Sequence, residues 1–223
     1  MDYREKIAAV RERIERACER TGRRPEEVTV IAVTKYVGVE ETRAILAAGI
    51  RDLGENRVQQ ALPKLDAIRQ PATWHFIGYL QTNKVKDVLP HFAWIHSLDR
   101  LSLAKELQKQ AEKRDLHVTC LVQVNISGEP TKSGLPPLEL AAFLDEIKLL
   151  NRIRVRGLMT MAPIADDPEQ VRPVFRGLRE LRDRLLPAYP ELQHLSMGMS
   201  GDFEVAVEEG ATMVRLGSIL VKP

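Results

Sequence analysis

Val28-Thr-Val-Ile-Ala-Val-Thr-Lys35 is an unbroken run of apolar and β-branched residues that ends in a lysine. Such residues fit a pleated strand, and a run without polar alternation is typical of a strand buried on both faces, as in a parallel sheet. Lys35 then lies at the C-terminal tip of the strand, where α/β barrels carry their chemistry. A partly desolvated amine in that place can form a Schiff base with a carbonyl compound. The alternative interpretation is a lysine without a chemical role, whose ammonium group extends into the solvent.

Extended and helical patterns alternate along the rest of the chain. Further strands are expected at residues 51–56, 74–77, 92–96, 117–124, 153–158, 191–195 and 212–216. Helices are expected between them, at residues 39–48, 56–69, 83–89, 101–111, 136–147, 168–185 and 202–210. Strict alternation implies a parallel sheet, and eight such units predict an α/β fold, a single (β/α)8 TIM barrel.

An extra helix is expected before the first strand. Ile7, Val10, Ile14 and Ala17 recur at the spacing of one helical face. No helix is expected after the last strand, so the leading helix should fill that place. Because no linker or low-complexity tract marks a boundary, residues 1–223 are expected to form one domain without a second β domain.

Composition narrows the class of partner. The 223 residues, 44% of them hydrophobic, can bury one substantial core, and 33 basic residues balance 31 acidic ones. This near-neutral charge balance does not indicate binding to nucleic acid or to an anionic membrane surface. Only Cys18 and Cys120 occur, neither with metal ligands at suitable spacing, and no signal peptide or membrane span is visible. We expect a cytoplasmic, reduced monomer with a small-molecule partner.

Two segments near the end of the chain favour a phosphate. Leu195-Ser-Met-Gly-Met-Ser200-Gly-Asp202 leads from a strand into a helix, and Val214-Arg215-Leu-Gly217-Ser218 ends the last strand. Hydroxyls and glycines in these places expose backbone amides to an anion, although ordinary turns use the same residues. Barrels commonly build phosphate sites from the loops after strands 7 and 8, next to strand 1. A lysine beside such a site suggests pyridoxal 5′-phosphate (PLP).

Several motifs extend this argument. The chain resembles the pyridoxal phosphate homeostasis protein family over nearly its whole length, through the following segments: Ala32-Val-Thr-Lys35, Gly54-Glu-Asn-Arg-Val-Gln59, Trp74-His-Phe-Ile-Gly78, Gln81-Thr-Asn-Lys84, Leu195-Ser-Met-Gly-Met-Ser200 and Val214-Arg-Leu-Gly217. The resemblance implies an alanine-racemase-like barrel of fold type III that holds PLP on Lys35 as an internal aldimine. It further implies the cofactor contacts: phosphate to Ser200, Gly217 and Ser218, pyridine nitrogen to Arg215, and ring to Asn56.

The same resemblance implies a role in intracellular PLP (vitamin B6) homeostasis, with PLP-dependent apoenzymes as recipients, and no settled reaction. Many relatives carry a second lysine two residues after the Schiff-base lysine, where this chain has Val37. Lys132 matches a mobile-loop lysine linked to cofactor handling, but a solvated loop lysine explains it equally well. His75 and Met159 are interpreted as wall residues before ligands.

Two other functions use the same residues. A low-activity amino-acid racemase would use the same cofactor, but racemases take a catalytic tyrosine from a second domain, and only Tyr36 and Tyr79 are candidates here. A Schiff-base aldolase acting on a phosphosugar would use Lys35 and the phosphate site without PLP. The visible absorption of a bound PLP aldimine distinguishes the aldolase from the other two.

Overall fold

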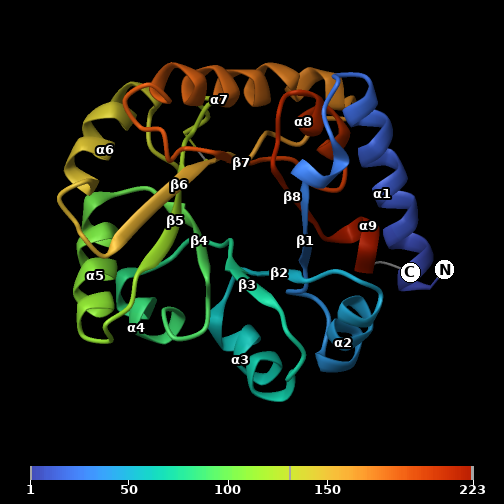
Figure 1. The fold of residues 1–223 in the computed structure, drawn as a ribbon, viewed down its shortest axis with the longest axis horizontal. Coiled ribbons are helices and arrows are strands. Elements are labelled where there is room, and N and C mark those ends of the chain that lie inside the picture. Colours follow the sequence, from blue (N-terminus) through green and yellow to red (C-terminus); the bar gives the residue numbers. More distant parts are fainter. Residues whose placement is uncertain (1, 131, 222–223) are drawn as a thin grey trace.

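The computed structural model describes residues 2–130 and 132–221, and within them eight parallel strands close into a barrel in the order of the chain (Figure 1). The strands are β1 (Thr29–Val33), β2 (Asp52–Glu55), β3 (Thr73–Phe76), β4 (Trp94–Leu98), β5 (Val118–Gln123), β6 (Ile153–Met159), β7 (His194–Ser196) and β8 (Met213–Leu216). β1 pairs with both β2 and β8, which closes the sheet. The predicted (β/α)8 barrel is confirmed.

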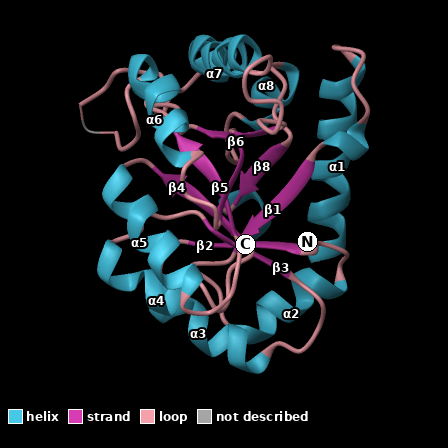
Figure 2. Cartoon of the chain, turned by 60° about the vertical axis from the view of Figure 1, so that its left-hand side comes forward, coloured by secondary structure: helices cyan, strands magenta, loops and turns pink. Residues whose placement is uncertain are grey.

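Helices surround the strands on the outside, as Figure 2 shows. They are α1 (Tyr3–Glu19), α2 (Val39–Ala47), α3 (Val58–Ala67), α4 (Val85–Val88), α5 (Leu101–Glu112), α6 (Leu140–Ile147), α7 (Arg172–Leu185), α8 (Phe203–Glu208) and α9 (Ser218–Val221). α4, α6 and α7 each follow a short 3₁₀ segment, at Thr82–Lys84, Pro137–Glu139 and Pro168–Val171. Asp167 caps the last of these, since its carboxylate accepts a hydrogen bond from the Glu169 amide at 3.0 Å.

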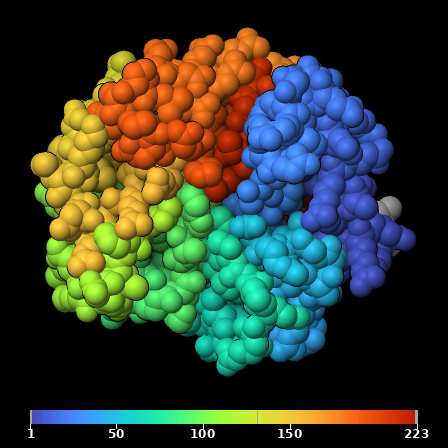
Figure 3. All heavy atoms as spheres, viewed as in Figure 1, coloured from blue at the N-terminus to red at the C-terminus, as the bar shows by residue number. Residues whose placement is uncertain are grey.

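The expectation that no helix follows the last strand is wrong, because α9 begins two residues after β8. α9 has only four residues, too few to leave a helical period in the sequence. α1 packs against both α8 and α9, and Figure 3 shows the red C-terminal part of the barrel beside the blue N-terminal part. Arg13 on α1 joins this contact, with its guanidinium 4.6 Å from the Phe203 ring centroid.

Several strand bounds differ from the predicted ones, with β4 at Trp94–Leu98 instead of 92–96, and for two strand ends a local hydrogen bond explains the difference. β1 ends at Val33, so Lys35 lies in a turn closed by a 3.1 Å hydrogen bond from the Val37 amide to the Thr34 carbonyl. β7 begins at His194 rather than Glu191, because the preceding residues form a turn in which the Leu192 amide bonds the Tyr189 carbonyl. In both places local backbone hydrogen bonds override the apolar pattern.

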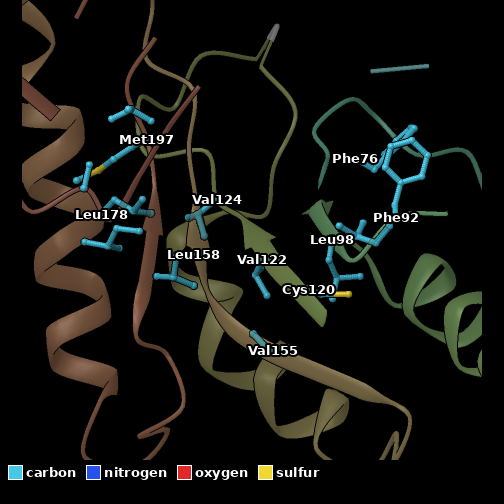
Figure 4. Close-up of a cluster of buried hydrophobic side chains, with 14 of the residues drawn as sticks. Phe76, Phe92, Leu98, Cys120, Val122, Val124, Val155, Leu158, Leu178 and Met197 are labelled. Carbon is cyan, nitrogen blue, oxygen red and sulfur yellow. The ribbon is translucent and has the colours of Figure 1, made fainter. Parts of the chain in front are cut away.

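Most of the apolar core lies between the strands and the helices. Figure 4 shows part of it, with Val122 and Leu158 from neighbouring strands, and with Phe76 against Phe92 in an edge-to-face pair at 5.3 Å. A separate cluster contains Ile31, Leu121, Met159 and Met213. The buried groups also include His75, His96, Ser196 and Arg215, which are polar and require hydrogen-bond partners.

Candidate functional site

A cavity of about 550 Å³ lies at the carboxyl ends of the strands and is bordered by all six residues that the sequence singled out. These are Lys35, Asn56, Ser200, Arg215, Gly217 and Ser218. They come from β8, from the loops after β1, β2, β7 and β8, and from the first residue of α9. The volume falls in the range of small-molecule sites, roughly 300–1,000 Å³.

Lys35 is the amine of this cavity. It is half-buried, and its Nζ lies 4.9 Å from the centroid of the Tyr36 ring. Tyr36 and Tyr79 stand at the rim with exposed fractions of 80% and 56%. The amine therefore lies close to water, next to an aromatic face that favours a cation.

A buried ion pair supports the turn that carries Lys35. Lys64 on α3 places its Nζ 2.6 Å from Glu55 Oε1 and also donates to the Thr34 carbonyl. Thr34 Oγ1 donates to the same carboxylate oxygen at 2.6 Å. Thr34 precedes Lys35 and Glu55 precedes Asn56, so this pair connects two cavity residues to one helix.

Sequence reasoning missed Glu55 and Lys64. The available signal was the position of Lys64, three residues after Ala61 and six after Val58 on the buried face of α3. A lysine on an apolar helical face is 4% exposed here, and a buried ammonium requires a carboxylate partner.

Arg215 forms the inner wall of the cavity and is 4% exposed. Its Nη1 donates to Ser196 Oγ at 2.7 Å and its Nη2 donates to the Thr160 carbonyl at 2.9 Å. Burial lowers the pKa of Arg215 to about 10, with the nearby carboxylate of Asp202 acting in the opposite direction. The guanidinium is thus fixed in orientation and remains positively charged at neutral pH.

A chain of hydrogen bonds runs from Arg215 through the barrel interior. Ser196 Oγ lies 2.9 Å from His96 Nδ1, and His96 Nε2 lies 2.9 Å from His75 Nδ1. His75 Nε2 lies 2.9 Å from the Asp52 carboxylate at the start of β2. Arginine only donates and carboxylate only accepts, so for neutral imidazoles the bonds run in one direction from Arg215 to Asp52, with each histidine donating from Nε2.

The loop after β7 meets the start of α9 at a cluster of donors. Ser200 Oγ accepts hydrogen bonds from the amides of Gly217 at 3.2 Å and Ile219 at 3.3 Å. The Asp202 carboxylate accepts from the Met199 amide at 2.6 Å, which fixes the loop. The hydroxyl proton of Ser200 remains available to donate to an anion beside these amides.

Two further observations concern the cavity wall at Asn56. Asn56 Oδ1 is buried without a hydrogen-bond partner in the described part of the chain, so a ligand donor would satisfy it. Gly78 lets the loop after β3 approach Asn56, because a Cβ at this position would lie 2.3 Å from the Asn56 carbonyl oxygen.

Other predicted positions lie outside the cavity wall. Lys132 does not border the cavity, but its neighbour Ser133 does. The Lys132 carbonyl accepts from Asn125 Nδ2 at 3.3 Å. His75 and Met159, interpreted from the sequence as wall residues, do not border the cavity but are buried in the barrel interior. Among residues 2–130 and 132–221, no group of His, Cys, Asp or Glu side chains could hold a metal ion, and no helix could cross a membrane.

Comparison with known proteins settles the family. Residues 6–223 match the model of the alanine racemase N-terminal domain. The pyridoxal phosphate homeostasis protein of Aquifex aeolicus is 47% identical over 99% of this chain and 97% of its own length. The chain belongs to the pyridoxal phosphate homeostasis protein family.

Solved structures agree with this assignment. PipY of Synechococcus elongatus PCC7942, whose structure has PLP bound, is 35% identical and aligns with a TM-score of 0.86 over 98% of this chain and 99% of PipY. An alanine racemase from Clostridium difficile 630 aligns with a TM-score of 0.77 at 17% identity, covering 98% of this chain and 56% of the racemase. The latter likeness shows a shared barrel fold.

Proposed function

We propose that this protein binds PLP in the cavity and carries it within the cell as part of vitamin B6 homeostasis, without turning over a substrate of its own. The observation that carries the proposal is the convergence, on one cavity, of the Lys35 amine, the donor cluster at Ser200 and the buried Arg215. The PLP bound to PipY and the name shared by the curated relatives support it.

Each cavity residue receives a role in this proposal. PLP supplies an aldehyde that condenses with primary amines, and Lys35 is the amine within the cavity. Ser200, Gly217 and Ser218 hold the phosphate through a hydroxyl and backbone amides. Arg215 donates a hydrogen bond to the pyridine nitrogen. Asn56 lies beside the ring, where its buried Oδ1 accepts a hydrogen bond from the ligand. An arginine at this nitrogen keeps it unprotonated, which weakens the electron sink that carbanion chemistry needs.

The exposure of the tyrosines at the cavity rim favours a carrier over a racemase. The two tyrosines that could serve as acids, Tyr36 and Tyr79, are mostly exposed. A wet rim provides neither a fixed second acid nor the water-excluded field that stabilises a carbanion. We infer that the protein is a cytoplasmic monomer and that it delivers PLP to PLP-dependent apoenzymes.

The decisive experiment is covalent trapping of the cofactor. Wild-type protein is loaded with PLP, its visible spectrum is recorded, and borohydride reduction is followed by peptide mapping. We expect visible absorption and one label on Lys35, and we expect Lys35→Ala to lose both while its circular dichroism stays native. Lys132→Ala is the matched control and should keep the label. A label on another lysine contradicts the assignment, and the absence of visible absorption favours the aldolase.

A further inference from the structure

A second cavity, of about 510 Å³, lies directly beside the first. Asn56, Gly78 and Tyr79 border both cavities, so the two share a wall. The close approach of Gly78 to the Asn56 backbone brings the loops after β2 and β3 together at this wall. A small molecule at the rim of the first cavity is therefore adjacent to the second.

The second cavity is bordered by residues of two motifs from which the proposed PLP contacts use only Asn56. Arg57, Val58 and Gln59 belong to Gly54-Glu-Asn-Arg-Val-Gln59, and Gln81 and Lys84 belong to Gln81-Thr-Asn-Lys84. These segments begin α3 and the 3₁₀ turn before α4. Segments more than twenty residues apart in the sequence thus border one space.

The charge of this cavity has one sign. Arg57 and Lys84 border it, and the described residues around it include no Asp or Glu. Within residues 2–130 and 132–221, neither side chain makes an ion pair or a hydrogen bond. Arg100, a neighbouring cation, is instead paired with Asp99 at 2.6 Å. Arg57 is exposed and Lys84 is partly buried, so an anion in this cavity would meet two positive charges with no carboxylate beside them among the described residues.

The polar groups around these cations suit an anion with several oxygens. α3 has ten residues and begins at Val58, and the amides of Val58 and Gln59 make no backbone hydrogen bond beside Arg57 within the described residues, whereas the amide of Gln60 donates to the Arg57 carbonyl. The side-chain amides of Gln59 and Gln81 supply further donors at the cavity wall. A phosphate monoester carries about two negative charges and accepts several hydrogen bonds, which matches this set better than a carboxylate with one charge.

We propose that the second cavity is a weak, non-covalent site for a phosphate monoester, at which a vitamin B6 phosphate rests before it enters the first cavity or after it leaves. This role rests on the proposed function, whereas the anion site rests on Arg57, Lys84 and the cavity itself. The shared wall at Asn56 and Tyr79 makes the passage between the two sites short.

The test fills the first cavity and then titrates the second. Protein that carries PLP reduced onto Lys35 is titrated calorimetrically with pyridoxine 5′-phosphate, which has no aldehyde, with inorganic phosphate, and with unphosphorylated pyridoxine. We expect saturable binding of pyridoxine 5′-phosphate and none of pyridoxine. Arg57→Ala and Lys84→Ala should each weaken this binding by roughly tenfold or more, as expected for the loss of a charge-assisted hydrogen bond. The control variants Arg69→Ala and Lys86→Ala should leave it unchanged.

Each outcome bears on the proposal. Binding of both phosphates supports a general phosphate site, and binding of the ester alone supports a site for vitamin B6 phosphates. An absence of saturable binding, or equal losses in the control variants, overturns the proposal. If no PLP is trapped on Lys35, the proposed function fails. In that case titration of unlabelled wild-type and Arg57→Ala protein with inorganic phosphate still tests the anion site.

Discussion

Arg215 Nη1 and Ser196 Oγ lie 2.7 Å apart, and this hydrogen bond sets the direction of the buried chain that continues through His96 and His75 to Asp52. Ser196 accepts from the guanidinium, and its single hydroxyl proton can then be donated to a neutral His96 at Nδ1. The serine therefore contacts both groups: it orients Arg215 against the cavity, and it connects Arg215 to the histidines behind it.

Ser196→Ala should weaken retention of the cofactor ring. The variant leaves a buried guanidinium N–H and a histidine nitrogen without a partner, and loss of a hydrogen bond to a charged group costs about 1.5–3 kcal/mol. We expect PLP and pyridoxal to lose affinity by similar factors, since the phosphate site is intact. Equilibrium dialysis of both ligands measures this.

Ser97→Ala is the matched control for this variant. Ser97 Oγ is buried without a partner in the described part of the chain, so its removal should leave ligand affinity unchanged. A loss in Ser196→Ala confined to the phosphorylated ligand would show that the serine does not act through the ring.

Stability should fall on mild acidification because of His96. Complete burial, followed by the charges of His75, Arg215 and His194, holds the pKa of His96 well below its ordinary value of 6.5. The unfolded chain then binds a proton that the folded chain refuses, so stability rises with pH in this range. The contribution is fully present above about pH 6.5 and is lost as the pH falls toward the folded-state pKa, by up to about 1.4 kcal/mol per pH unit.

Urea unfolding at pH 7.5, 6.0 and 5.0 tests this slope. Burial and the charge of Arg156 also lower the pKa of His194, so part of the pH dependence of stability comes from that residue. The variant His96→Asn separates the two contributions, and its stability should change less with pH than that of the wild type. An exposed histidine, His91, provides the control His91→Asn. If stability depends on pH equally in the wild type and in His96→Asn, the loss on acidification does not come from His96.

Local sequence pattern predicted the barrel, Lys35 and the loops at Ser200 and Arg215, whereas Asn56 was implied only by the resemblance to the family. An apolar run that leads to Thr34-Lys35 and a turn rich in Ser and Gly are visible along the chain, and the barrel brings the ends of its strands together. The chain from Asp52 to Arg215 was not predictable in this way, since its members lie on five different strands or loops and pair only through the register of the closed sheet. α9 was missed because four residues carry no period.

Lys64→Met should destabilise the fold strongly. It leaves the fully buried Glu55 carboxylate without its cation, and breaking a buried pair in this way costs roughly 3–5 kcal/mol. Lys64→Met combined with Glu55→Gln should recover part of the loss, because the uncompensated charge is removed. Chemical denaturation of the single and double variants gives the coupling energy. Arg16→Ala, which breaks an exposed pair with Glu12, should change stability by less than about 1 kcal/mol.

Ser200→Ala should reduce the preference for phosphorylated ligand. The variant removes a hydroxyl donor and the acceptor of the Gly217 and Ile219 amides, while Arg215 and the ring contacts stay in place. We expect PLP to bind about tenfold or more weakly and pyridoxal to bind nearly as before, in line with one lost charge-assisted bond. If the ratio of the two affinities does not change, the phosphate lies elsewhere.

The absence of useful turnover is the strongest consequence of the carrier proposal, and it follows from what surrounds Lys35. Racemisation needs an acid or base on each side of the substrate Cα, and the Lys35 amine supplies one side. The candidates for the other side, Tyr36 and Tyr79, are 80% and 56% exposed. We therefore expect alanine and other amino acids to exchange Cα hydrogen with deuterated water only slowly, with no net inversion, in PLP-loaded wild-type protein. Lys35→Ala sets the background rate of free PLP. Inversion with exchange at rates of about 1 s⁻¹ or more, the range of ordinary enzymes, would replace the carrier with a racemase.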